Sequence, residues 1–217
     1  MKAVWGIFVA ALGCPLVTMA QPATDFNRWE LGGEFGTAEH ALSHSSEDNK
    51  VDEQDAAYRV FATYYFTPQV AIRVGYADLG EVDWYKDAYY DDYTNTRVNE
   101  LSARSSADTL TVGGVFTLPI NASPVTFGVE IGFLNWTVDY ATVDSRTPDG
   151  GNTVVESATY SSSDIGFYGG ASVSYQMMPQ MAVGLGVLWY AMTPEINGDD
   201  GFDLVVQNLN LSAVFRF

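Results

Sequence analysis

The residues of this chain that could do chemistry form no recognisable catalytic motif. The two histidines, His40 and His44, lie in an acidic stretch with no helical pattern, so we expect both to be exposed in a loop. The single cysteine is Cys14, and the sequence holds no HExxH zinc motif, phosphate-binding P-loop or GxSxG nucleophile elbow. We therefore expect no enzymatic activity, no metal and no cofactor.

A second group of charged residues is set among apolar ones; Arg216, for example, stands between Phe215 and Phe217. Successive side chains of a β-strand point to opposite faces, so these charges would share the face opposite to the apolar one. Charges at membrane depth are costly and must pair with one another. Three acids and three bases are the candidates for such pairs inside a barrel: Glu30, Glu34, Arg59, Arg73, Glu130 and Arg216.

The elements that would position these charges are segments in which apolar residues alternate with small or polar ones. Such segments occupy residues 29–35, 58–66, 70–77, 109–118, 127–133, 164–175, 181–189 and 208–217. Roughly ten residues suffice for a tilted strand to cross a bilayer. Hydrocarbon offers no hydrogen-bond partners, so such a sheet must close on itself. The sequence predicts an all-β fold, an eight-stranded antiparallel up-and-down transmembrane β-barrel.

The connections between these segments alternate in length. Short turns are expected at 67–69, 119–124 and 177–180, and longer polar stretches at 38–55, 78–107, 137–162 and 191–203. Short turns on one side and long loops on the other are typical of a bacterial outer-membrane barrel, with extracellular loops. An even number of strands then leaves both termini in the periplasm.

Closure of the barrel would make the first and last strands neighbours. Glu30 begins the first segment and Arg216 nearly ends the last, so we predict that these two residues form an ion pair. We predict a second pair, Glu34 with Arg59, across the first hairpin. Because the interior of an eight-stranded barrel is only wide enough for side chains, paired charges would fill it and leave no large pore.

The N-terminus has the features of a secretory signal peptide. Lys2 precedes an apolar stretch, and Thr18-Met19-Ala20 forms a small-x-small cleavage site before Gln21. We therefore expect a removed signal peptide at residues 1–20, cleaved between Ala20 and Gln21, and a barrel domain at 21–217. The alternative is a lipoprotein acylated on Cys14, although the preceding residues match a lipobox only loosely.

The net charge of −17 excludes a basic nucleic-acid-binding face. Most of the 27 acids cluster in the long polar stretches, where we expect solvated loops. The alternative is that these loops bind divalent cations at a lipopolysaccharide surface.

Three motifs carry a resemblance to a known family. Residues 64–80, Tyr-Tyr-Phe-Thr-Pro-Gln-Val-Ala-Ile-Arg-Val-Gly-Tyr-Ala-Asp-Leu-Gly, resemble the second hairpin of the OmpA-like membrane-barrel family, and Gly132–Trp136 resembles its fifth strand. Phe215 and Phe217 resemble the C-terminal signal that the barrel-assembly machinery reads. The resemblance implies a monomer in the Gram-negative outer membrane, surrounded by lipid and lipopolysaccharide and assembled by that machinery. The peptidoglycan-binding domain of larger members is not expected here.

Together these features favour a non-enzymatic outer-membrane protein that supports envelope integrity or surface interactions through acidic loops. A narrow gated channel for ions or small solutes is the main alternative. A lipid A-modifying enzyme and a soluble lipocalin-type carrier are less favoured; a carrier of that type would need the reverse polarity, with its apolar face inside.

Overall fold

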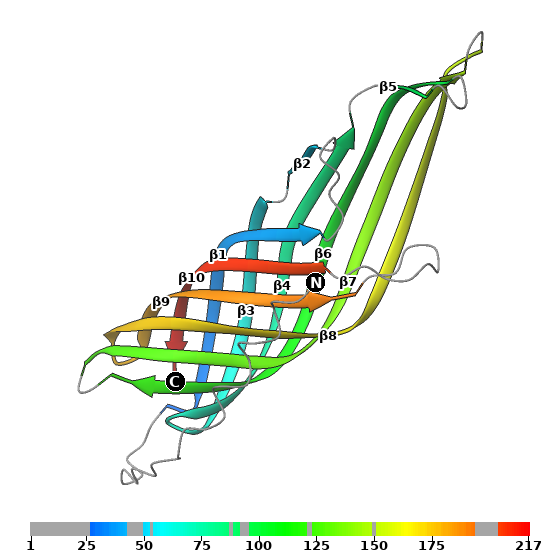
Figure 1. The fold of residues 1–217 in the computed structure, drawn as a ribbon. Helices are drawn as coiled ribbons and strands as arrows, with labels where there is room; N and C mark the ends of the chain where they lie inside the picture. The colour runs from blue at the N-terminus through cyan, green and yellow to red at the C-terminus, as the bar shows by residue number, and fades with distance from the viewer. Residues whose placement is uncertain are drawn as a thin grey trace, which may run out of the picture.

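The computed structural model describes residues 27–42, 50–52, 54–86, 89–91, 96–120, 123–148, 151–193 and 204–217. All regular structure in these residues is β-strand (Figure 1), and no helix among them is long and apolar enough to cross a membrane. The strands are β1 (Trp29–Leu42), β2 (Lys50–Asp52), β3 (Gln54–Thr67), β4 (Val70–Lys86), β5 (Tyr89–Asp91), β6 (Thr96–Pro119), β7 (Val125–Pro148), β8 (Val154–Met178), β9 (Met181–Met192) and β10 (Leu204–Arg216).

Eight of these strands form a closed antiparallel ring, which confirms the predicted barrel. The order runs β4-β3-β1-β10-β9-β8-β7-β6, and pairing of β4 with β6 closes it. Between the first and last strands, Trp29 N–H donates to the Phe217 carbonyl at 3.2 Å and Phe217 N–H to the Trp29 carbonyl at 2.9 Å. The short strands β2 and β5 pair with β4 and β6 outside the ring.

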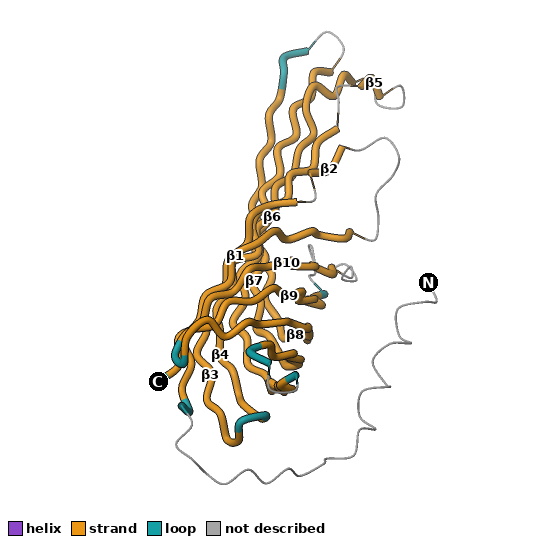
Figure 2. The backbone as a smooth tube through the Cα atoms, turned by 90° about the vertical axis from the view of Figure 1, so that its left-hand side faces the viewer, coloured by secondary structure: helices purple, strands orange, loops and turns teal. Residues whose placement is uncertain are grey.

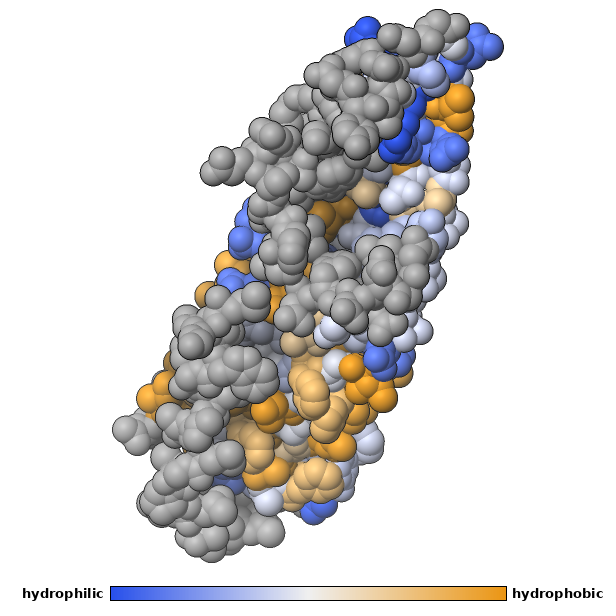
Figure 3. Space-filling view, turned by 45° about the vertical axis from the view of Figure 1, so that its right-hand side comes forward, coloured by the Kyte–Doolittle hydropathy of each residue, from blue (hydrophilic) through white to orange (hydrophobic). Residues whose placement is uncertain are grey.

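The outward face of the ring is a band of exposed apolar side chains. In β7, for example, Val129, Ile131 and Phe133 are exposed, whereas the residues between them are buried. At one end the band stops at the short turns; at the other it ends near Phe35 and Leu110, and polar residues follow. Figure 3 shows apolar residues gathered over this lower part of the molecule and more polar ones above it. Exposure of so many large apolar side chains is stable only where hydrocarbon surrounds them.

Four strands continue beyond the band and form a sheet extension, composed of residues 79–86 of β4, 96–107 of β6, 137–148 of β7 and 154–166 of β8 (Figures 1 and 2). Strands β6, β7 and β8 have 24, 24 and 25 residues, whereas β9 and β10 have 12 and 13. Pairing of β8 with β9 begins only at Phe167 and Ala191, so the outer part of β8 lies beyond β9.

The extension corrects the expectation that 78–107 and 137–162 are loops. Most of these residues are paired strands. Buried apolar residues recur at only a few positions of the extension, such as Leu79, Val98 and Val138, so no continuous apolar alternation marks these strands. Strand pairing depends only on backbone groups. Within β4 a bulge falls between Asp78 and Glu81, and Gly80 adopts a φ of 79° there, where a Cβ would lie 2.7 Å from the Ala56 carbonyl oxygen.

Candidate functional site in the barrel lumen

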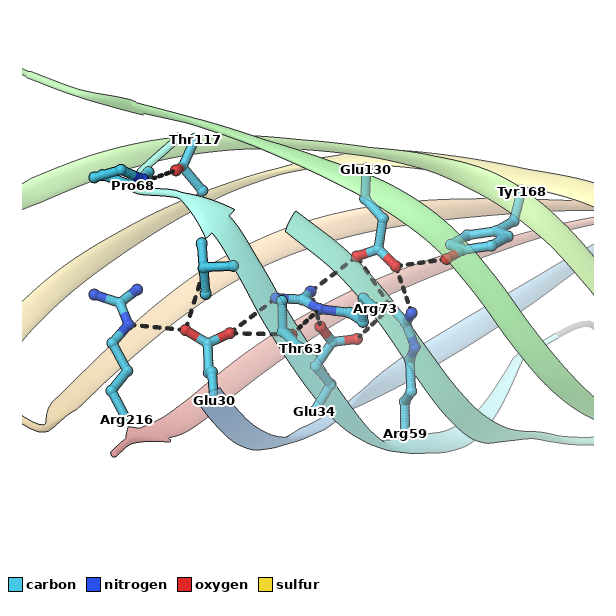
Figure 4. Close-up of polar contacts among 11 residues, drawn as sticks. Glu30, Glu34, Arg59, Thr63, Pro68, Arg73, Thr117, Glu130, Tyr168 and Arg216 are labelled. Carbon is cyan, nitrogen blue, oxygen red and sulfur yellow. Dashed lines mark hydrogen bonds and ion pairs between the residues drawn. The ribbon is translucent and has the colours of Figure 1, made fainter. Parts of the chain in front are cut away.

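The six charged residues expected inside the barrel all lie in the lumen, toward its turn end. We call this group the charge cluster (Figure 4). Strands β1, β3, β4, β7 and β10 contribute its members, because inward positions recur at every second residue. The exposed fractions of their side chains range from 2% for Glu30 and Arg59 to 23% for Arg216. The cluster consists of Glu30, Glu34, Arg59, Arg73, Glu130 and Arg216.

Glu130 is one of two centres of this cluster. Its carboxylate accepts from Arg59 Nη2 at 2.5 Å and from Arg73 Nη1 at 2.8 Å. The Tyr168 hydroxyl donates to the same carboxylate at 2.7 Å. Both carboxylate oxygens therefore have charged partners, which offsets much of the cost of burying them.

Glu30 is the other centre. It lies opposite Arg216 in the β1–β10 register, and Arg216 Nε donates to Glu30 Oε2 at 2.9 Å. Arg73 Nη2 donates to Glu30 Oε1 at 3.0 Å, so Arg73 connects the two centres. Arg73 Nε also donates to the Thr63 hydroxyl at 2.8 Å.

Glu34 has longer contacts. Arg59 Nη1 lies 3.6 Å from Glu34 Oε2, and Arg73 Nη1 lies 4.0 Å from Oε1. Glu34 and Arg59 are cross-strand partners in β1 and β3, as the hairpin geometry predicts. The guanidinium of Arg73 also lies 3.9 Å from the centre of the Phe61 ring, a cation–π contact. Three carboxylates and three guanidiniums are thus arranged with alternating sign.

A second layer of the lumen lies toward the sheet extension and is apolar. We call it the apolar layer. Trp136, Tyr190 and Val138 are each 1% exposed, and all of them point inward. Tyr168 joins the two layers, because its hydroxyl bonds Glu130 while its ring stacks on Tyr190 with centroids 6.0 Å apart. The layer consists of Ala38, Ala57, Ala77, Leu79, Ala107, Leu134, Trp136, Val138, Tyr168, Leu188, Tyr190, Met192, Leu204 and Val206.

The sequence reasoning missed this apolar layer, although a signal for it exists. Leu134, Trp136 and Val138 stand at two-residue intervals after Glu130, on the face already assigned to the lumen. Continuing that alternation beyond the membrane-spanning segment would have placed them inside.

His40 is not the exposed loop residue that the sequence predicted. It lies on β1 beyond the apolar band, points inward, and is only 2% exposed. Its Nε2 lies 2.9 Å from the carbonyl oxygen of Leu79 at the β4 bulge. Burial lowers the pKa of His40, outweighing the opposing effects of the Leu79 carbonyl and of Asp55. The sequence prediction was wrong because strand β1 remains paired with β10 as far as Leu42. His40 is therefore a strand residue on the inward face and not part of a loop.

A small cavity lies beside the charge cluster. Its volume is about 60 Å³, enough for a few water molecules. Its lining includes the charged residues Glu30, Arg73 and Arg216 together with Ser172, Ser212 and several glycines. Within the described residues no three metal-ligating side chains come together.

The remaining candidates lie elsewhere. Phe215 and Phe217 are exposed on the outward face of the last strand, with ring centres 6.2 Å apart. Ala20, Gln21, Cys14 and His44 lie outside the described residues.

A comparison with protein families gives a match over residues 7–217 to the outer membrane protein beta-barrel domain. The chain belongs to this family. Membership places the protein in the outer membrane of the Gram-negative envelope. A search of curated proteins found no significant match.

Solved structures of outer-membrane barrels share this fold. OprG of Pseudomonas aeruginosa is 11% identical with a TM-score of 0.51, and the match covers 88% of this chain and 97% of OprG. Ail, the attachment invasion locus protein of Yersinia pestis, is 12% identical with a TM-score of 0.50, covering 88% of this chain and 99% of Ail. At such identities the likeness shows the fold alone.

Proposed function

We propose that this protein is a closed, non-enzymatic outer-membrane barrel that holds an acidic sheet at the cell surface. The observation that carries the proposal is the occupation of the lumen by two successive layers. Charged side chains bridge the turn end of the barrel, and Trp136, Tyr190 and their neighbours fill the space beyond them. An ion crossing the barrel would have to break buried ion pairs and then enter an apolar core, and both steps are costly.

The sheet extension supports a role at the surface. At about 3.3 Å per residue, the part of β8 beyond β9 is roughly 40 Å long, which is more than membrane anchoring requires. Asp139, Glu156 and Asp164 are exposed on it. Its acids are partly balanced, since Arg104 Nε lies 2.7 Å from Asp83 Oδ1 and Arg104 Nη1 lies 3.3 Å from Glu81 Oε2. In our proposal the extension faces the outside of the cell and the short turns face the periplasm.

The absence of catalysis is part of the proposal. His40 is buried inside the wall and bonded to a backbone carbonyl, so it reaches neither the lipid nor bulk solvent. This position supports a structural role for His40.

Planar bilayer recording tests closure. We expect the purified, folded protein to give no steady open conductance. A steady conductance in the unmodified protein would overturn the proposal in favour of a channel. The water-sized cavity beside Arg73 and Arg216 is the observation that favours that second candidate, which would require the apolar layer to open.

Cysteine labelling on intact cells tests orientation. Ser161→Cys lies on the extension and Gln69→Cys in a short turn. We expect a membrane-impermeant maleimide to label Ser161→Cys and to spare Gln69→Cys until the outer membrane is permeabilised. The reverse pattern would show that the extension faces the periplasm.

Binding of an oligolysine peptide tests the acidic surface. In nanodiscs we expect the variant D139N/E156Q/D164N to bind several-fold more weakly than the unmodified protein, with less dependence on salt. Unchanged binding would remove the extension as the acidic surface.

A further inference from the structure

The sheet extension has two edges, and only one of them is paired with another described strand. On the β4 side, β2 pairs with residues 83–85. On the β8 side, pairing with β9 begins at Phe167, and among the described residues no strand pairs with residues 154–166 on that side. In Figure 1, β8 forms the right-hand border of the extension. The closed-barrel function assigns no role to this edge.

Alternate residues of β8 direct their backbone groups at this edge. The Ala158 carbonyl oxygen accepts from Thr142 of β7 at 3.4 Å. The Asp164 carbonyl oxygen accepts from Asn135 of β7 at 3.5 Å, so the even-numbered residues face β7. In an antiparallel ladder the residues between them direct N–H and C=O to the opposite side. At Ile165 the N–H donates to the Asp164 carboxylate at 2.7 Å. Five exposed residues present backbone groups along the rest of the edge: Val155, Ser157, Thr159, Ser161 and Ser163.

The edge lacks the features that prevent strand addition. Exposed edges are usually protected by lysine, proline, a bulge or a covering element. Residues 154–166 contain no lysine, arginine or proline, and their pairing with β7 continues without a register shift. The valines, threonine, tyrosine and isoleucine of this segment favour extended backbone. The edge is therefore suited to take up an additional strand.

A second copy of this chain does not fit the edge. Two barrels in one membrane are related by a rotation about the membrane normal, so their β8 strands run in the same direction. Two copies that share a sheet through the same edge must pair antiparallel, because the twofold axis is then perpendicular to the sheet. Glu156 and Asp164 also give each edge an excess of negative charge, so two edges would repel each other.

The charges at the edge favour a basic partner. Glu156 and Asp164 are exposed on β8, and Asp139 is exposed on the neighbouring strand β7. Arg146 of β7 donates to Asp144 at 2.7 Å, so its charge is already balanced. A side chain directly opposite on an added strand lies about 5 Å away, Cβ to Cβ. A lysine or arginine opposite Glu156 or Asp164 therefore forms a cross-strand ion pair.

We propose that the edge of β8 binds an extended basic segment of another protein, which adds an antiparallel strand to the sheet extension. The five edge residues hydrogen-bond to the backbone of the segment, and its basic side chains pair with Glu156 and Asp164. The inference rests on the proposed function in one respect, because the outward orientation of the extension makes the partner an extracellular one. Binding to the purified protein does not depend on this orientation.

Fluorescence anisotropy with the protein in nanodiscs tests the proposal. The probe is a labelled 13-residue peptide, as long as residues 154–166, that consists of threonine with valine at positions 2 and 12 and lysine at positions 3 and 11. In antiparallel register its lysines lie opposite Asp164 and Glu156. The control peptide carries N-methyl groups at positions 4, 6, 8 and 10, which removes the N–H donors toward the edge and leaves the charge unchanged. We expect the control peptide to bind at least tenfold more weakly.

Proline variants of the protein locate the binding site. Thr159→Pro removes an N–H that faces away from β7 and places ring carbons at the edge, so β8 stays paired with β7 while an added strand is blocked. We expect the probe peptide to bind this variant at least fivefold more weakly. Thr159→Val keeps the N–H and is the matched control, with binding within twofold of the unmodified protein. Ser163→Pro is the second variant if Thr159→Pro does not fold, and heat-modifiable gel migration verifies folding.

Three outcomes would overturn the proposal. Equal binding of the probe and the N-methylated peptide would show that charge attraction alone holds the peptide. Unchanged binding in the folded proline variants would show that the peptide binds elsewhere, and no binding of the probe to the unmodified protein would show that the edge accepts no such strand. Failure of the proposed orientation is seen separately, because Ser161→Cys would then be labelled only after permeabilisation while the purified protein still bound the probe.

Discussion

The two layers of the lumen follow one another along the same strands, yet they are built in opposite ways. The charge cluster depends on direction, because Glu130 has to meet Arg59 and Arg73 at 2.5 and 2.8 Å. The apolar layer depends on volume, because Trp136, Tyr190 and Val206 need only be packed without gaps. The difference teaches that alternation along a strand assigns a face to each side chain, while the partners across the lumen decide what holds the interior together.

The largest effect should come from the charge cluster. Glu130→Ala would leave Arg59 and Arg73 without their closest carboxylate, and removing one partner of a buried ion pair costs about 3–5 kcal/mol. We expect a loss of this size in the free energy of unfolding, measured by urea titration in detergent micelles. Replacing Arg59 and Glu130 together with methionine should recover part of it. Glu39→Ala, an exposed position on β1, is the control. A loss no larger than that of the control would remove Glu130 as a centre of the cluster.

The apolar layer should respond to a loss of volume. Trp136→Ala opens a cavity among Tyr190, Leu134 and Val138, and such truncations cost about 3–5 kcal/mol. Trp136→Phe, which keeps an aromatic ring at this position, should lose less stability than Trp136→Ala. Unlike Glu130→Ala, both variants should leave the charge cluster intact. Circular dichroism during thermal unfolding measures the change. Equal stability of Trp136→Ala and the unmodified protein would show that the layer contributes no packing energy.

The contact between the first and last strands should give a smaller effect. A double-mutant cycle with Glu30→Gln and Arg216→Gln should yield a coupling free energy of about 1–2 kcal/mol. The value is moderate because Arg216 is partly exposed and because Glu30 keeps Arg73 as a partner. Additive single substitutions would mean that the 2.9 Å contact adds nothing to closure.

The smallest effect should be the response of His40 to acid. Its pKa in the folded protein is lowered by burial, so below pH about 6.5 the unfolded chain binds a proton that the folded one resists. Stability of the outer ends of β1 and β4 should therefore fall as the pH drops through this range. Hydrogen exchange at pH 5.5 and 7.5 measures it. His40→Gln should abolish the difference, whereas His44→Gln should retain it; the opposite result would assign the response to His44.

Much of the fold follows from the sequence alone. Alternation of apolar and polar residues predicted the eight strands, their inward faces and the six lumen charges. It does so because one face of a membrane-spanning strand contacts hydrocarbon and the other faces the lumen. The positions of Glu30 in the first strand and Arg216 in the last were enough to predict that they face each other, since closure makes these two strands neighbours.

Three features were decided only by the tertiary structure. The paired extension was hidden because its side chains are mostly polar and leave no continuous apolar alternation, while backbone pairing operates regardless of side-chain type. The place of Arg73 between Glu30 and Glu130 depends on distances across the lumen, which no spacing along one strand contains. The burial of His40 depends on the Leu79 carbonyl, which a bulge in another strand presents to it. Local sequence fixes which way a side chain points, and only the closed barrel brings it to a partner.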